Sequence, residues 1–65
     1  MIELTDLNKV PFLLNPFHIE TIRKIPETKI TLTNGNYYLV SEGQDEVVSK
    51  IIAYNRRVLS QLTAK

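Results

Sequence analysis

The dipeptide Asn34-Gly35 constrains the fold of this chain more than any other feature, because it separates two short segments of alternating character. The segments are Lys29–Thr33 before it and Tyr37–Val40 after it. Asn-Gly between such segments is the strongest short-range signal for a β-hairpin, since a type I′ turn requires positive φ at both central residues. The sequence therefore predicts an antiparallel pair of strands closed by a two-residue turn.

A two-residue turn also fixes which side chains share a face of this hairpin. Residues directly opposite each other project to the same side of a sheet, and a shift of one residue moves a whole strand's side chains to the other side. We expect the face made only of apolar and aromatic side chains to be buried. That face carries Ile30, Leu32, Tyr37 and Leu39, and the other carries Lys29, Thr31, Tyr38 and Val40.

The N-terminal segment repeats this arrangement less clearly. Ile2–Thr5 alternates, Asn8-Lys9 follows, and Val10–Leu14 is mostly apolar. A hairpin with a two-residue turn would place Leu4 opposite Leu13, although lysine is unfavourable where φ is positive. The sequence predicts two paired N-terminal strands with a loosely defined register.

Residues 16–28 leave two structures open. Ile19, Ile22 and Ile25 recur every three residues, which fits either a short helix or a strand interrupted by a bulge. The β-branched residues of this segment favour a strand. We therefore expect an α+β fold in one domain, residues 1–65. An antiparallel sheet of five strands over about residues 2–41, twisted or closed into a small barrel, precedes one helix.

The C-terminal third predicts that helix over about residues 42–62. Ser41 and Gln44 match the Ser-x-x-Gln capping box, in which each side chain bonds a backbone N–H at the helix start. Acidic residues come early and arginines late, which complements the helix dipole. No proline follows Ser41.

This helix carries an apolar stripe wider than one sheet face requires. At about 100° per residue the stripe spans about 160°, whereas about 100° is enough to dock on a sheet. We expect the excess to contact a second copy of the chain. Asn55 lies within the stripe, where it can fix the register of a helix–helix contact or hydrogen-bond within its own subunit. The expected interface consists of Val48, Ile51, Ile52, Asn55, Leu59 and Leu62.

The size of the chain favours self-association as well. Domains below about 70–80 residues usually need disulfides, a metal or oligomerisation to supplement a small core, and this chain has 65 residues. It contains no cysteine for disulfides or a thiolate zinc site, and its single histidine excludes a multi-histidine metal site. We therefore expect a homo-oligomer.

Composition argues against several classes of function. The formal charge of +1 gives no electrostatic footprint for nucleic acid. No apolar run approaches the roughly 18 residues that span a bilayer, and the N-terminus lacks the features of a secretory signal. No phosphate-binding loop, carboxylate pair or nucleophile triad is evident, and we expect His18 to be structural. The expectation is a soluble cytoplasmic protein without enzymatic activity, cofactor, metal or small-molecule substrate.

Two groups of polar residues are candidates for partner contacts. Arg56 and Arg57 lie on the polar side of the predicted helix, although the helix dipole also explains late basic residues. Lys29 and Tyr38 share the mixed face of the predicted hairpin, and an aromatic ring beside a cation can bind a single nucleic-acid strand. A solvated sheet face is the more ordinary interpretation of that second group.

Short segments occur in a characteristic order along residues 1 to 58. They are Met1–Thr5, Leu7-Asn8, Pro11–Asn15, Ile19–Ile22, Pro26–Thr28, Ile30–Gly35, Tyr38–Val40, Glu46–Val48 and Tyr54–Arg57. In order and spacing they resemble the FlbD family of small flagellar proteins, also called SwrD. The chain departs from the family pattern at Lys9, where the family usually has glycine, and at His18, where it commonly has an aliphatic residue.

The resemblance implies a non-enzymatic cytoplasmic protein encoded with flagellar genes. It further implies a role in swarming motility, in which the protein raises flagellar motor power through the stator units. Such a protein would lie at the cytoplasmic side of the motor without inserting into the membrane. The family has no recognised catalytic residues. The alternative, which depends on Lys29 and Tyr38, is a small RNA-binding regulator of flagellar genes.

Overall fold

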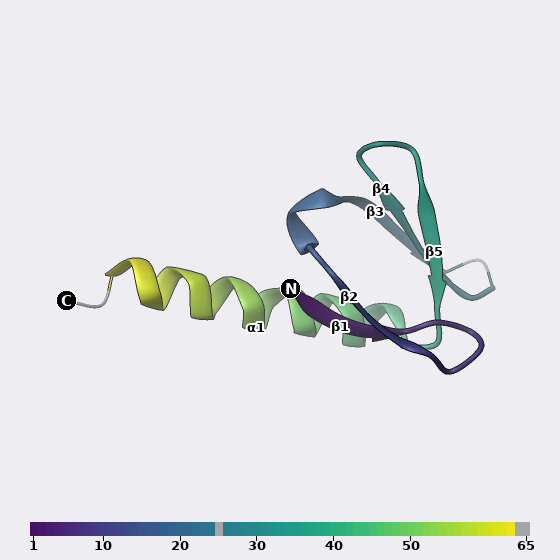
Figure 1. The fold of residues 1–65 in the computed structure, drawn as a ribbon, viewed down its shortest axis with the longest axis horizontal. Helices are drawn as coiled ribbons and strands as arrows, with labels where there is room; N and C mark the ends of the chain where they lie inside the picture. The colour runs from purple at the N-terminus through teal and green to yellow at the C-terminus, as the bar shows by residue number, and fades with distance from the viewer. Residues whose placement is uncertain (25, 64–65) are drawn as a thin grey trace.

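A computed structural model describes residues 1–24 and 26–63 of the chain, with side chains described to residue 60. These residues form five short strands, one 3-10 turn and one long helix. Strands followed by a C-terminal helix were predicted, and this α+β organisation is confirmed (Figure 1). In chain order the elements are β1 (Ile2–Thr5), β2 (Pro11–Leu14), the 3-10 turn η1 (Pro16–His18), β3 (Ile19–Lys24), β4 (Thr28–Leu32), β5 (Tyr37–Val40) and α1 (Gln44–Thr63).

The strands form two antiparallel sheets rather than one. Strands β1 and β2 make a two-stranded sheet, and β3, β4 and β5 make a three-stranded sheet in that order. A single bridge between Asp6 and Val40 joins the two. The prediction of one five-stranded sheet or a closed barrel is therefore wrong.

Hydrogen bonds at Thr5 explain why the pairing of β1 with β5 does not extend beyond the bridge between Asp6 and Val40. The Thr5 carbonyl accepts the Ser41 N–H (N···O 2.8 Å) and the Ser41 hydroxyl (3.2 Å). The Thr5 N–H donates to a carboxylate oxygen of Glu42 at 2.9 Å. The Ser41 N–H bond belongs to the Asp6–Val40 bridge itself, whereas Glu42 takes the Thr5 N–H that the next pair of a longer β1–β5 ladder would need.

The hairpin between β4 and β5 has a three-residue loop. Leu32 N–H donates to the Asn36 carbonyl (2.7 Å), and Gly35 N–H donates to the Leu32 carbonyl (3.0 Å). Gly35 has φ +91°, whereas Asn34 is outside the left-handed region and accepts the Asn36 N–H with its side chain. A loop of this length needs positive φ at one residue only, so glycine alone satisfies it.

The extra loop residue shifts the register by one. Ile30 pairs with Tyr38 instead of Leu39, and Thr31 pairs with Tyr37. The predicted register is wrong, and every side chain of β5 lies on the opposite face from the one expected. Val40 is consequently buried and Tyr37 faces outward.

The first hairpin uses the same loop geometry. Lys9 N–H donates to the Asp6 carbonyl at 3.0 Å, and Lys9 has φ +68°. The Asp6 carboxylate accepts the N–H groups of Asn8 (2.8 Å) and Val10 (3.0 Å). Strand β1 therefore pairs Leu4 with Phe12, and the predicted pairing with Leu13 is wrong for the same reason as in the second hairpin.

Residues 16–24 adopt the strand alternative, preceded by a single 3-10 turn. Asn15 begins the turn by accepting the Phe17 N–H with its side chain at 3.0 Å. Strand β3 then pairs with β4, and its register shifts between Ile19 and Thr21. The predicted bulged strand is confirmed there, while Ile25 lies outside the described residues.

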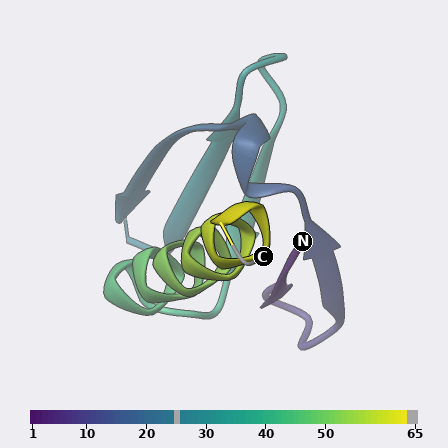
Figure 2. The same ribbon diagram turned by 90° about the vertical axis from the view of Figure 1, so that its left-hand side faces the viewer.

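Helix α1 lies against β1 and β3, and Figure 2 shows it beside both sheets. Two ring contacts add to this packing. Phe12 and Tyr38 link the two sheets with ring centroids 5.0 Å apart, and Phe17 meets Tyr54 of α1 edge-on at 5.8 Å. The buried apolar side chains that form the core are Ile2, Leu4, Leu14, Ile30, Leu32, Val40 and Val47.

The helix begins at Gln44, two residues later than predicted. The Gly43 carbonyl accepts the Val47 N–H at 3.0 Å, whereas the Ser41 hydroxyl bonds to β1. The predicted capping box is therefore wrong, because Ser41 lies too far before the helix to cap it. The C-terminal half of α1 extends past the sheets (Figure 1), and the molecule measures 43 × 23 × 18 Å.

Candidate interaction surfaces

One line of α1 exposes apolar side chains to solvent. Val48 is 40% exposed, Ile52 47% and Leu59 60%. Their spacing of four and seven residues keeps them on one side of the helix, and Asn55 lies between them and is exposed too. We call Val48, Ile52, Asn55 and Leu59 the α1 stripe. The buried Val47 points to the core instead.

The six residues predicted for an interface therefore divide into three groups. Four of them form the α1 stripe. Ile51 is half-buried and packs against the core of its own chain. The side chain of Leu62 lies outside the described residues.

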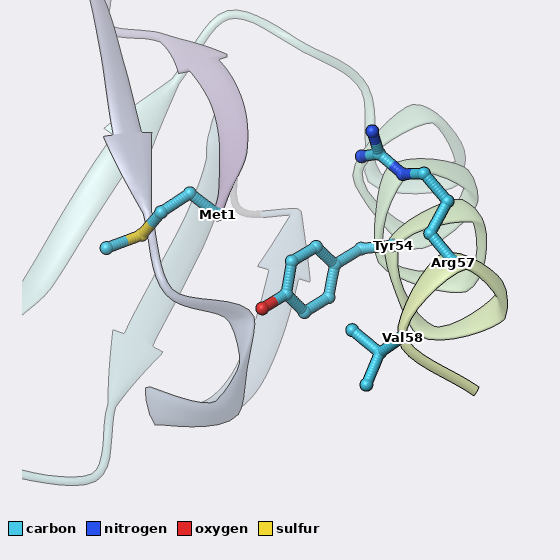
Figure 3. Close-up of a pocket in the computed structure, with 4 residues that line it drawn as sticks. All are labelled: Met1, Tyr54, Arg57 and Val58. Atoms are coloured by element: carbon cyan, nitrogen blue, oxygen red, sulfur yellow. The ribbon is translucent and has the colours of Figure 1, made fainter. Parts of the chain in front are cut away.

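The side of α1 that faces β1 makes a polar contact and borders a hollow. Lys50 Nζ donates to the Glu3 carbonyl at 2.8 Å. Near the N-terminus, a hollow of about 280 Å³ is lined by Met1, Tyr54, Arg57 and Val58 (Figure 3). Arg57, predicted as a weak partner contact, lies in the wall of this hollow.

Arg56, the other arginine predicted to contact a partner, is exposed. It lies between the α1 stripe and the polar face of the helix, so it borders the stripe without belonging to it. Sequence reasoning did not find the hollow beside Arg57, because only the folded chain brings Met1 to the middle of α1.

A second hollow lies on the solvent side of the three-stranded sheet. Arg23 of β3 is directly opposite Lys29 of β4, and Thr21 is directly opposite Thr31. These four residues line a volume of about 380 Å³. Lys29 Nζ also lies 4.4 Å from the centre of the Tyr37 ring. We call these five residues the outer sheet face.

The predicted pairing of Lys29 with Tyr38 on one face is wrong. Tyr38 lies on the inner face, against Phe12, and Tyr37 takes its place beside Lys29. The cause is the one-residue shift in register. The sequence contained the right residue types for an aromatic–cation pair but assigned the wrong tyrosine to it.

At the junction between β5 and α1, the carboxylate of Glu42 has a clearly shifted pKa. Burial alone would raise the pKa of Glu42, but hydrogen bonds from Thr5 and the nearby charge of Lys50 outweigh burial. The pKa of Glu42 is therefore below its ordinary value of 4.5. This carboxylate is tied to β1, so its role is to hold the helix entry in place.

Metal-binding geometry is not found within residues 1–24 and 26–63. No group of three His, Cys, Asp or Glu side chains there is placed to hold a metal ion. His18 is exposed, and its carbonyl accepts the Thr33 N–H at 2.9 Å. None of the described helices is long and apolar enough to cross a membrane. What this part of the chain does offer is two surfaces: the α1 stripe and the outer sheet face.

Comparison with known proteins identifies one family. The model of the FlbD family, described as flagellar and swarming motility proteins, matches residues 1–59. The match covers all five strands and most of α1, so the resemblance inferred from the sequence is confirmed. Among curated proteins and solved structures, none is significantly similar to this chain.

Proposed function

The chain belongs to the FlbD family of flagellar and swarming motility proteins, and on that premise we propose that it is a non-enzymatic accessory protein of the flagellar motor. In this proposal it acts in the cytoplasm, on the stator units, and raises the power of the motor during swarming. The family match over residues 1–59 is the observation that carries the proposal. Two exposed surfaces suited to protein contacts support a role as an interaction protein.

The proposal includes self-association through the α1 stripe. Val48 and Ile52 are 40% and 47% exposed, whereas the core formed by the described residues contains seven buried apolar side chains. Burying this area against a second copy would add hydrophobic stabilisation of about 25 cal/mol per Å². The Asn55 side chain has no hydrogen bond within the described residues, so it is available to pair across such a contact.

A substitution in the α1 stripe separates self-association from folding. In Ile52→Asp the carboxylate would be unpaired and buried in a dimer, but about half exposed in a monomer. We expect a folded chain with the mass of a monomer. Ala53→Asp places the same charge at an exposed position well outside the α1 stripe and should leave the mass of the assembly unchanged. Ile51→Asp is less informative, because Ile51 packs on its own core.

The motor role is tested by deleting the gene and measuring swimming speed in viscous medium, with flagella counted on the same cells. Normal flagella with slow swimming would support a role in motor power. Complementation with Ile52→Asp should fail, and complementation with Ala53→Asp should succeed. Fewer flagella in the deletion strain would instead assign the protein to assembly or gene expression and contradict the stator proposal.

RNA-mediated regulation of flagellar genes is the alternative, and the geometry gives it less support. It depended on Tyr38 and Lys29 sharing a face, whereas Tyr38 packs against Phe12. Crosslinking of RNA to the protein in cells tests this alternative. RNA recovered with the wild-type chain and lost with Tyr37→Ala would favour it over the stator proposal.

A further inference from the structure

The outer sheet face has the chemistry of an anion-binding surface. We infer that the outer sheet face binds an acidic segment of a partner protein. Arg23 and Lys29 would bind two neighbouring carboxylates of that segment, and Thr21, Thr31 and Tyr37 would border them. The inference rests on the proposed function, because it names the chemistry of the partner through which the protein would act. The evidence for the surface itself is independent of that role.

Two like charges stand opposite each other on this face. Arg23 and Lys29 are direct cross-strand partners, an arrangement that destabilises an antiparallel pair when both residues carry the same charge. No carboxylate in the described part of the chain forms an ion pair with either side chain. The chain therefore keeps an uncompensated pair of cations where a carboxylate from another molecule would be favourable.

The surroundings of the two cations suit a carboxylate pair. The guanidinium group of Arg23 presents a planar set of donors that matches both oxygens of a carboxylate. The hydroxyl-bearing Thr21 and Thr31 lie in the adjacent row, and all four residues border one hollow of about 380 Å³. Tyr37 contacts the Lys29 ammonium with its ring and so limits where that charge can lie.

A protein segment fits this face better than a nucleic-acid strand. A bound strand presents a phosphate at every nucleotide, and its affinity depends on a groove of cations that follows the backbone. Among the described residues, two cations line the hollow. Exposed carboxylates of Glu20 and Glu27 occur near the two ends of β3, where a longer polyanion would meet them. Lys24 follows Arg23 in the chain but lies directly opposite the buried Thr28, so it belongs to the other face of the sheet and adds no cation to the outer sheet face.

The test is an NMR titration of the full chain at low salt with a short polyglutamate peptide and, separately, a polyglutamine peptide of equal length. We expect polyglutamate alone to shift the amide signals of Thr21, Arg23, Lys29 and Thr31. Arg23→Gln should weaken binding about tenfold, the effect of losing one charge-assisted contact. The matched control Lys24→Gln removes one charge from the adjacent residue of β3 and should change binding less than twofold.

Folding does not confound the comparison. Arg23 and Lys24 are both exposed, and Arg23→Gln relieves a repulsion, so its melting temperature should not fall. Equal weakening by Arg23→Gln and Lys24→Gln would show nonspecific charge attraction and overturn the inference. Shifts with single-stranded polyuridylate but not with polyglutamate would overturn it too, and would assign the face to RNA. If no probe binds while the deletion strain still swims slowly, this inference fails and the motor role stands.

Discussion

At the scale of single residues, the two hairpin loops show how much one backbone angle constrains the sequence. Lys9 and Gly35 occupy equivalent positions, each the last residue of a three-residue loop and each at positive φ. A residue with a Cβ is disfavoured there by about 1–2 kcal/mol, whereas glycine is not. We expect Lys9→Gly to raise the free energy of unfolding by about 0.5–1 kcal/mol, after the greater entropy of glycine in the unfolded chain is subtracted.

Thermal unfolding measures this effect, because about 1 kcal/mol shifts the melting temperature of a domain of this size by about 4–8 °C. Gly35→Ala is the reciprocal control. It should destabilise the chain by about 1 kcal/mol through the backbone alone, since a Cβ at Gly35 would meet no atom within 4 Å beyond its two neighbours in the chain. A lower melting temperature for Lys9→Gly would show that the Lys9 side chain makes a stabilising contact.

Glu42 makes the free energy of unfolding depend on pH. Its pKa is lowered in the folded chain, so its contribution is complete above its ordinary value of 4.5 and is lost as the pH falls through the folded pKa. Glu42→Gln should therefore lower the stability at pH 7 by about 1 kcal/mol, the value of a hydrogen bond to a partly buried charge. It should also make the melting temperature fall less between pH 5 and pH 3. Parallel acid profiles for the two chains would contradict this role.

At the scale of elements, the register of β4 and β5 assigns different roles to two adjacent tyrosines. Tyr38 contacts the Phe12 ring at the junction of the two sheets, and Tyr37 lies on the outer sheet face. We expect Tyr38→Ala to cost about 2 kcal/mol, less than for a fully buried aromatic residue because Tyr38 is partly exposed. Tyr37→Ala should cost below about 0.5 kcal/mol. A two-residue turn would give the reverse order in denaturant unfolding.

The same hairpin shows what could and could not be predicted from the sequence. Alternation and turn residues predicted the strands, and helical periodicity predicted α1, because each is a local property. The loop length could not be predicted, since Asn34-Gly35 is compatible with a two-residue or a three-residue loop. The choice changes which tyrosine meets Lys29, so the composition of the outer sheet face depended on a register that only tertiary packing fixes.

The junction of β5 and α1 shows a second limit. Ser41 matched the sequence pattern of a helix cap, yet its hydroxyl bonds to the Thr5 carbonyl, 36 residues away along the chain. A polar residue near a helix start has several possible partners, and a distant strand is invisible to a local pattern. The positions of the α1 stripe, by contrast, could be predicted from the sequence, because side chains on one side of a helix recur at the helical spacing.

At the scale of the whole molecule, the proposed self-association can be given a direction. Both sheets lie beside the N-terminal half of α1, and the other half projects away from them (Figure 1). The first turn of α1 is acidic, with Asp45 and Glu46, whereas Arg56 and Arg57 follow later. An antiparallel pair of α1 helices aligns opposite helix dipoles, separates the acidic first turns of the two copies, and keeps their sheets apart.

Single cysteines can test this geometry, because the native chain contains none. In an antiparallel pair along the α1 stripe, Val48 lies near Leu59 of the second copy and Ile52 near Asn55. The Val48 residues of the two copies are then about 16 Å apart, at a rise of 1.5 Å per residue, which exceeds the limit of about 7 Å between the Cα atoms of a disulfide. We therefore expect a mixture of Val48→Cys and Leu59→Cys chains to form the mixed disulfide dimer under mild oxidation, while Val48→Cys alone does not crosslink. Rapid crosslinking of Val48→Cys to itself would show a parallel pair, in which identical residues face each other. The decisive control is Ala53→Cys, exposed and well outside the α1 stripe: if it crosslinks as fast as the mixture, the disulfides arise from random collision and the α1 stripe is not the contact.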